Sequence, residues 1–259
     1  MTTEGRTVLA EFHPPGPADF DLPPIFGDVT KPMVLYVLSA VLIFGVFYAA
    51  SRRAAVVPGK MQFAGEYAYN FVRNSIARDS IGSADFMKFV PYLTALFFLI
   101  LVNNYYGLLP VLQFPTFSHS GYAYGLAALT WILYNGVGIA KHGVGGYFKL
   151  QTVPGGVTGP ILLLIVPLEF MSNILVRPVT LALRLFANMF AGHLLLILFA
   201  TGGAALLASG NILYGAVGVL SFGLGIGVSF LEMLVMFLQA YVFTLLTAMY
   251  VSGAVADEH

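Results

Sequence analysis

The sequence contains no cysteine and little charge, and each absence excludes a class of function. Without cysteine among 259 residues, the chain has no disulfide bond, no thiolate metal site and no cysteine nucleophile. Charged residues make up only 9% of the chain and the formal net charge is zero, so the basic surface that binds nucleic acid is missing. The hydrophobic share of 58% instead predicts an all-α polytopic membrane protein in a single membrane domain, 1–259.

Acidic residues precede the first long apolar run. Five of them lie within residues 1–32: Glu4, Glu11, Asp19, Asp21 and Asp28. A secretory signal would begin with basic residues instead. The run over 33–50 predicts the first span, and Arg52 and Arg53 directly after it are typical of the cytoplasmic end of a membrane helix. We therefore expect residues 1–32 to be a retained tail on the outer side.

Residues 60–78 predict an interfacial helix, because Gln62, Glu66 and Asn70 share one face of a helix whose other face is largely apolar. Val90–Leu109 and the run 122–140 each approach the length of about 20 residues that a span needs. They predict two upright helices that form a hairpin. The segment joining them contains no Lys or Arg and is expected outside.

The distribution of basic residues predicts the orientation in the membrane. Eight of the twelve Lys and Arg residues fall on the predicted cytoplasmic side: Arg52, Arg53, Lys60, Arg73, Arg78, Lys88, Lys141 and Lys149. Arg6 and Lys31 fall outside, which satisfies the positive-inside rule. The remaining two, Arg177 and Arg184, fall within the membrane.

Two apolar runs, 161–200 and 212–251, are too long to stand upright. At 1.5 Å per residue each would measure about 60 Å, twice a hydrocarbon core of about 30 Å. Either both helices are steeply tilted, at about 60° to the membrane normal, or the first breaks into two spans at Arg177-Pro178. No Gly or Asn cluster accompanies Pro178, so a tilted antiparallel hairpin that turns near 208–211 is favoured.

Arg184 is the most informative residue of the first run. A guanidinium stays protonated, and a charge at the centre of a membrane helix costs about 2.5–3.5 kcal/mol, so it predicts a functional site. On an ideal helix Arg177 and Asn188 lie within about 40° of Arg184, Glu169 lies at about −60°, and His193 lies on the opposite side.

Residues that face each other in an antiparallel hairpin lie equally far from its turn. This rule predicts two facing pairs, each at its own height along the hairpin. Arg184 is then opposite Gln239, and His193 is opposite Glu232. Imidazole titrates near neutral pH, and desolvation raises the pKa of a carboxyl group towards the same range. The second pair therefore predicts a proton relay.

Several of these residues have a structural alternative. His193 could be a hydrogen-bonded helix contact, and Arg177 could extend to lipid headgroups. Glu169 could be the ion partner of Arg177 or simply hydrated. Asn104 could cap a helix end. The glycines over 215–227 predict close helix packing.

Four segments together resemble one family, the a subunit of the membrane sector of F-type ATP synthases. They are VPGKMQ at 57–62, NYYGLLP at 104–110, RPVTLALRLFANMFAGH at 177–193 and LEMLVMFLQAYVFTLLTAMY at 231–250. They occur in the family's order and cover nearly the whole chain. The run from Arg184 through Asn188 to Ala191-Gly192 is the most specific of them.

The resemblance implies a stator that provides two proton half-channels and is not itself catalytic. Arg184 would face the carboxylates of the rotating c-ring, with Gln239 as its polar neighbour. His193 and Glu232 would line the outer half-channel. Asn104, Asn188 and Glu169 complete the predicted proton-translocation residues. No cofactor and no metal are implied.

The resemblance also implies partners and a location. The partners are the c-subunit ring, the peripheral-stalk b subunits, the rest of the ATP synthase, the lipid bilayer and the translocated protons. The location is a bacterial plasma membrane, with the N-terminus outside and the C-terminus in the cytoplasm. The sequence leaves open whether the ion is a proton or sodium.

This chain departs from the family pattern at two places. Some relatives carry Glu after the Ala-Gly and His at the level of Glu232, so the pair looks exchanged here and its proton order stays open. Gly107 stands where some members have an acidic residue. A secondary transporter or an ion channel with an intramembrane His–Glu relay is the alternative function, but the internal repeat typical of transporters is not visible. An intramembrane enzyme lacks the necessary metal-ligand motif.

Overall fold

The computed structural model describes residues 13–20, 23–52, 55–83, 85–109, 112–153, 159 and 161–256. Arg53, Pro110 and residues 1–12 of the predicted tail lie outside these ranges. The described residues form helices and no strand, and five helices are long and apolar enough to cross a membrane. The prediction of an all-α polytopic membrane protein is therefore confirmed.

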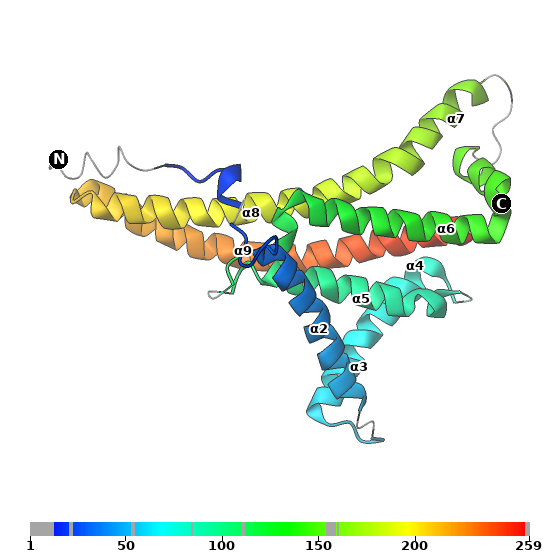
Figure 1. Cartoon of the computed structure of the whole chain (residues 1–259), viewed down its shortest axis with the longest axis horizontal. Helices are drawn as coiled ribbons and strands as arrows, with labels where there is room; N and C mark the ends of the chain where they lie inside the picture. Colours follow the sequence, from blue (N-terminus) through cyan, green and yellow to red (C-terminus); the bar gives the residue numbers. More distant parts are fainter. Residues whose placement is uncertain are drawn as a thin grey trace.

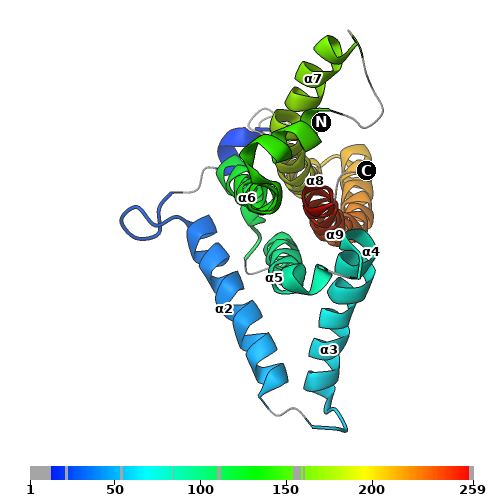
Figure 2. The same cartoon turned by 90° about the vertical axis from the view of Figure 1, so that its right-hand side faces the viewer.

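The first span is helix α2, Lys31–Ser51, which begins with Pro32 in its first turn. Helix α3, Lys60–Val72, runs back along it, and the two approach so closely at Gly65 that an added Cβ would lie 2.6 Å from Ala50 Cβ. The helix continues as a π-helical turn η2, Arg73–Arg78, and a short α4, Asp79–Ile81. Figures 1 and 2 show α2 and α3 projecting away from the other helices.

The two helices of the predicted 90–140 hairpin are α5, Phe86–Tyr105, and α6, Ser120–Thr152, which pack mainly against α8 and α9 rather than against each other. Their connection contains the short 3-10 helix η3, Thr116–Ser118. Helix α6 consists of two helical parts that meet at a break at Gly143, where φ is +70°, a conformation that suits glycine, and the predicted span 122–140 lies within the first part. The residues after the break fold back, so that the ring of Tyr147 lies directly on Gly138.

The long run that contains Arg184 does not reverse at Arg177-Pro178. Helix α7, Leu162–Phe170, leads through a π-helical turn η4, Met171–Val176, into α8, Arg177–Ala208. Pro178 lies just after this turn, and a proline inside a helix removes one backbone hydrogen-bond donor, so the helical path bends here but continues. Figure 1 shows α7 leaving the line of α8 at an angle.

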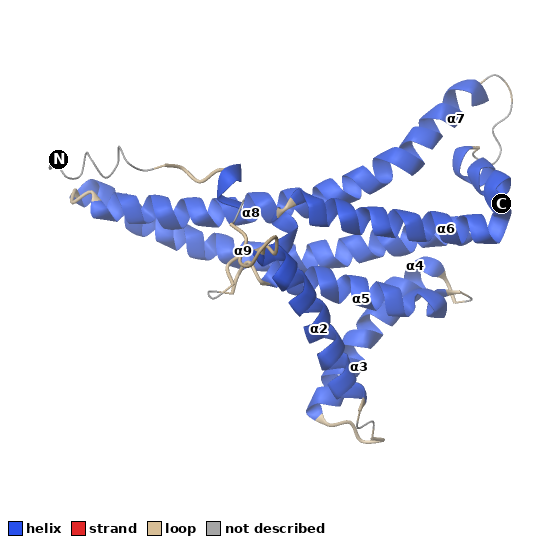
Figure 3. Cartoon of the chain, viewed as in Figure 1, coloured by secondary structure: helices blue, strands red, loops and turns tan. Residues whose placement is uncertain are grey.

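Helices α8 and α9 form the predicted antiparallel hairpin. Helix α9 spans Ile212–Val255, and the turn between the helices contains Gly210 at φ +68° and Asn211, whose side chain caps α9 by accepting from the Leu213 amide. Figure 3 shows the two helices side by side along the longest dimension of the molecule. Among the glycines over 215–227, Gly218 and Gly225 contact α8, whereas Gly215, Gly223 and Gly227 have open space beside them.

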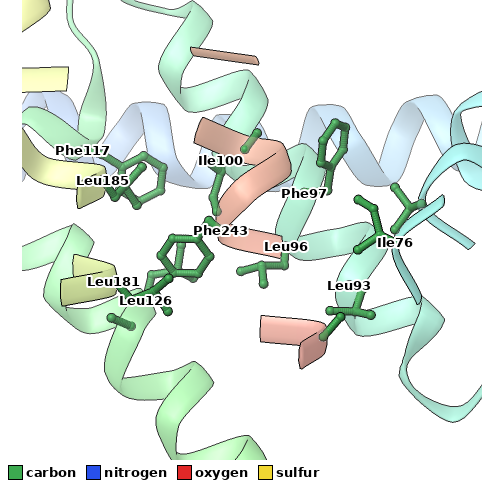
Figure 4. Packing of buried hydrophobic residues seen from close by; sticks show 14 of the residues in the cluster. Ile76, Leu93, Leu96, Phe97, Ile100, Phe117, Leu126, Leu181, Leu185 and Phe243 are labelled. Atoms are coloured by element: carbon green, nitrogen blue, oxygen red, sulfur yellow. The ribbon is translucent and has the colours of Figure 1, made fainter. Parts of the chain in front are cut away.

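The hydrophobic core lies where α5, α6, α8 and α9 meet η2 and η3. Figure 4 shows its side chains converging from all six elements: Ile76, Leu93, Leu96, Phe97, Ile100, Phe117, Leu126, Leu181, Leu185 and Phe243. Each is buried, and between membrane helices such side chains stabilise the fold by close van der Waals packing. This packing fixes the inner faces of α8 and α9 and leaves their outer faces free.

Candidate functional site

Arg184 lies on the outer face of α8. Thr180, Arg184, Ala187, Ala191 and Leu195 are all exposed and follow one another at helical spacing, so they form a stripe along the helix. The arginine is the charged member of this stripe. Within the ranges that the structure describes, no carboxylate pairs with it. The charge of an exposed arginine on an apolar membrane helix is costly in lipid, which makes Arg184 a candidate functional residue.

Gln239 of α9, the predicted neighbour of Arg184, lies beside Asn188, one turn further along α8. Gln239 is only 3% exposed, and its Oε1 accepts a hydrogen bond of 2.8 Å from Asn188 Nδ2. Asn188 follows Arg184 by one turn on α8. The hairpin therefore brings Gln239 to the site, but its amide bonds to Asn188.

Glu232 is buried against α8, where Gly192 makes room for it. The carboxylate is 5% exposed, and a Cβ added to Gly192 would lie 2.9 Å from Glu232 Oε1. Both carboxylate oxygens are buried and have no hydrogen-bond partner among the residues that the structure describes. Such a carboxylate is costly unless protonated or hydrated, which suits a group that exchanges protons.

His193 follows Gly192 and lies against Phe20, which precedes α2. It is 8% exposed, and its ring meets the edge of Phe20 with centroids 5.9 Å apart. Among the described residues no hydrogen bond joins it to Glu232, and its Nδ1 is buried without a partner. The pair is therefore close in level but is not directly bonded.

Asn104 reaches α9 from the last turn of α5. It is fully buried, and its Nδ2 donates to the backbone carbonyl of Met236 over 3.4 Å. Met236 follows Glu232 by one turn of α9. The alternative that Asn104 caps a helix end is wrong, because its side chain contacts another helix. It lies instead between the levels of Glu232 and Gln239.

Glu169 lies at the other end of the site, before the π-helical turn. Its Oε2 accepts from Asn173 Nδ2 over 2.9 Å. The alternative of an ion pair with Arg177 is wrong, since the guanidinium lies 5.1 Å from the centre of the Tyr250 ring and no such pair occurs among the described residues. The angle of −60° calculated for Glu169 assumed a regular α-helix, which the π-helical turn interrupts.

The two carboxylates of the candidate spans lie on opposite sides of Arg184. In the described parts of the five helices long enough to cross a membrane, Glu169 and Glu232 are the acidic residues. Glu232 lies at the level of Gly192, about 12 Å from Arg184 along α8, and Glu169 lies on the other side of Arg184, beyond the π-helical turn. No cluster of three potential metal ligands occurs in the described ranges.

Sequence reasoning missed the residues that shape the outer part of the site. Gly192 was quoted within a motif, but its role depends on the approach of Glu232 from another helix. Phe20 reaches His193 from a segment distant in the chain. No periodicity in the sequence reports these contacts.

Comparison with known proteins identifies the family. The family described as ATP synthase A chain matches residues 33–252. The ATP synthase subunit a of a Nocardioides species is 62% identical over 96% of this chain and 95% of its own length. That of Pseudarthrobacter chlorophenolicus is 50% identical over 96% of each chain. That of Streptomyces lividans is 40% identical over 96% of this chain and 89% of its own length.

The chain belongs to the ATP synthase subunit a family. The region matched to that family contains every predicted site residue, from Asn104 to Gln239. Within this family member the position of Gly107 has little space, because an added Cβ would lie 3.2 Å from Pro115. The fold of this loop therefore favours glycine at position 107.

Proposed function

We propose that this chain is the stator subunit of the F-type ATP synthase membrane sector that carries protons to and from the c-ring. The observation that carries the proposal is Arg184, a charged side chain on an exposed apolar stripe of a membrane helix without a partner in the described chain. Its counter-charge would be the carboxylate of each rotor subunit that passes the stripe.

The role of Arg184 follows from the cost of charge in lipid. A rotor carboxylate can face lipid only when it is protonated, so rotation through lipid requires proton loading on one side of the arginine and release on the other. The fixed positive charge favours the ionised carboxylate as it passes. It also blocks protons from crossing directly between the two half-channels.

The two carboxylates that flank Arg184 supply a group for each half-channel. Glu232, together with His193 and Asn104, would line the outer route, with bridging water between the histidine and the carboxylate because they are not directly bonded. Asn188 and Gln239 continue that route towards Arg184. Glu169 would serve the cytoplasmic route.

The energy for rotation comes from the membrane potential. Each elementary charge that crosses 100 mV releases about 2.3 kcal/mol, so several protons must pass for each ATP made. The basic residues support an orientation in a bacterial plasma membrane with the N-terminus outside and the C-terminus in the cytoplasm. The peripheral-stalk b subunits would hold this chain against rotation.

Replacement of Arg184 tests the proposal. Arg184→Ala should abolish ATP synthesis and ATP-driven proton pumping in membrane vesicles while the chain still assembles into the complex, because the coupling charge is removed. Thr180→Ala, one turn earlier on the same stripe, is the matched control and should retain both activities. Substantial ATP synthesis by the Arg184→Ala complex would refute the proposed function.

A further inference from the structure

A network of hydrogen bonds joins the folded-back end of α6 to the π-helical turn η4. Asn173 Nδ2 donates to Glu169 Oε2 over 2.9 Å and to the Gln151 carbonyl over 2.7 Å. Gln151 Nε2 donates to the Tyr147 hydroxyl over 3.3 Å, and that hydroxyl donates to Asn135 Oδ1 over 3.0 Å. The network therefore reaches from a carboxylate on α7 across both parts of α6.

The indole of Trp131 closes the network. Its Nε1 donates to the Ile174 carbonyl in the π-helical turn over 2.9 Å, while its own carbonyl accepts from Asn135 Nδ2 over 2.7 Å. A π-helical turn disturbs the regular pairing of backbone carbonyls, and such turns are frequent at functional sites. Here α6 provides a donor to that turn, so the irregular geometry is held from outside the helix.

Two local features of α6 make the network possible. The break at Gly143 returns the chain, and the absence of a side chain at Gly138 lets the Tyr147 ring pack directly on the helix. This packing brings the Gln151 carbonyl to Asn173. Tyr147 is fully buried, and Gln151 and Asn173 are buried as well. Buried hydrogen-bonded groups of this kind hold a single arrangement, because any other leaves polar atoms unpaired.

We propose that Asn173 is a positioning residue that holds the Glu169 carboxylate in the cytoplasmic proton route, with the folded-back end of α6 fixing Asn173 in turn. The inference rests on the proposed function of the chain. An amide nitrogen donates two hydrogen bonds, and here one fixes the carboxylate while the other is anchored on the backbone of α6. Glu169 therefore keeps its direction while protons are exchanged and the rotor turns.

The proposal predicts a specific pattern of variants in the assembled complex. In inverted membrane vesicles, Asn173→Ala should lower the initial rate of ATP-driven proton pumping about tenfold, the effect of losing one hydrogen bond to a charged group. Asn173→Gln keeps the amide donor and should recover about half of the lost rate. Tyr147→Phe, which removes the hydroxyl that links Gln151 to Asn135, should lower the rate in the same direction. Ser172→Ala, an exposed neighbour on the same turn, is the control and should pump normally.

The same substitution, made in the wild-type complex and in a complex without the Glu169 carboxylate, distinguishes a positioning role of Asn173 from a structural one. If Asn173 acts through Glu169, Asn173→Ala should cause no further loss in a Glu169→Gln complex. Equal losses in both backgrounds, or no rescue by Asn173→Gln, would overturn the proposal. An Arg184→Ala complex that loses coupling while Asn173→Ala pumps like Ser172→Ala would overturn this inference and leave the proposed function standing.

Discussion

At the scale of single residues, Glu232 shows how a carboxylate is accommodated inside this hairpin. Its side chain occupies the space that a Cβ of residue 192 would need. Glycine at 192 therefore acts by its lack of a side chain. Because both oxygens of Glu232 have no partner in the described chain, the position of the carboxylate depends on this space.

Gly192→Ala should therefore impair proton transport. The new methyl group would lie 2.9 Å from Glu232 Oε1, so the carboxylate must move away from α8. The end of the Glu232 side chain is flexible, so we expect normal assembly of the complex and a fall of about tenfold in proton pumping, because the carboxylate is displaced from its position. The initial rate of ATP-driven acidification of membrane vesicles measures this loss.

Gly223→Ala is the matched control for that variant. Gly223 lies on α9 with nothing within 4 Å of an added Cβ, so the same change is accommodated there. Equal pumping by the two alanine variants would show that the position of Glu232 against Gly192 does not matter for transport.

The charged residues of the candidate site could be proposed from the sequence, because charged residues are rare in its long apolar runs. Arg184, Glu232 and Glu169 are conspicuous because ionised side chains are costly in membrane helices. Gly192 and Phe20 could not be predicted, because a glycine and a phenylalanine are ordinary residues in an apolar sequence. Their importance arises from contacts with residues far away in the chain.

At the scale of elements, the hairpin of α8 and α9 has a register that its turn determines. Pairs of residues equally far from the turn do face each other: Gly192 meets Glu232, and Phe199 meets Gly225. The register was predictable because both helices are continuous on either side of Gly210. It drifts by about one turn at Asn188 and Gln239, which are further from the turn than the other pairs.

A cysteine pair tests this register. An added Cβ at Gly225 would lie 3.3 Å from Phe199 Cβ, near the separation of about 3.5–4.5 Å found in disulfides. Phe199→Cys with Gly225→Cys should therefore form a cross-link under mild oxidation of this otherwise cysteine-free chain. Mass analysis of the peptides identifies the bond. Phe199→Cys with Gly223→Cys, where the second residue faces open space, should stay reduced, and efficient cross-linking of that pair would contradict the register.

Two irregular elements could not be predicted from periodicity. The π-helical turn over Met171–Val176 occupies a run that reads as regular helix, and it is held by Trp131 and Gln151 from α6. The break at Gly143 lies in a segment with several glycines, so the sequence did not distinguish which of them takes a positive φ. Both features are decided by tertiary contacts.

At the scale of the whole molecule, the core lies on one side of the long hairpin. Helices α5 and α6 pack against α8 and α9, while α2 and α3 project away from them (Figure 2). The outer face of the hairpin remains apolar and exposed, with Arg184 on it. This arrangement leaves a long surface for a partner that passes the arginine, which is the central claim of the proposed function.

Site-directed cross-linking in the assembled complex tests that claim most directly. Ala187→Cys places a thiol on the exposed stripe one turn from Arg184, and Val41→Cys places one on the exposed side of α2 as a control. Each is labelled with a photoreactive maleimide, and the cysteine-free chain corrects for label on other subunits. The account predicts that position 187 cross-links to the rotor subunit and position 41 does not. Cross-links to the rotor from position 41 but not from position 187 would contradict it.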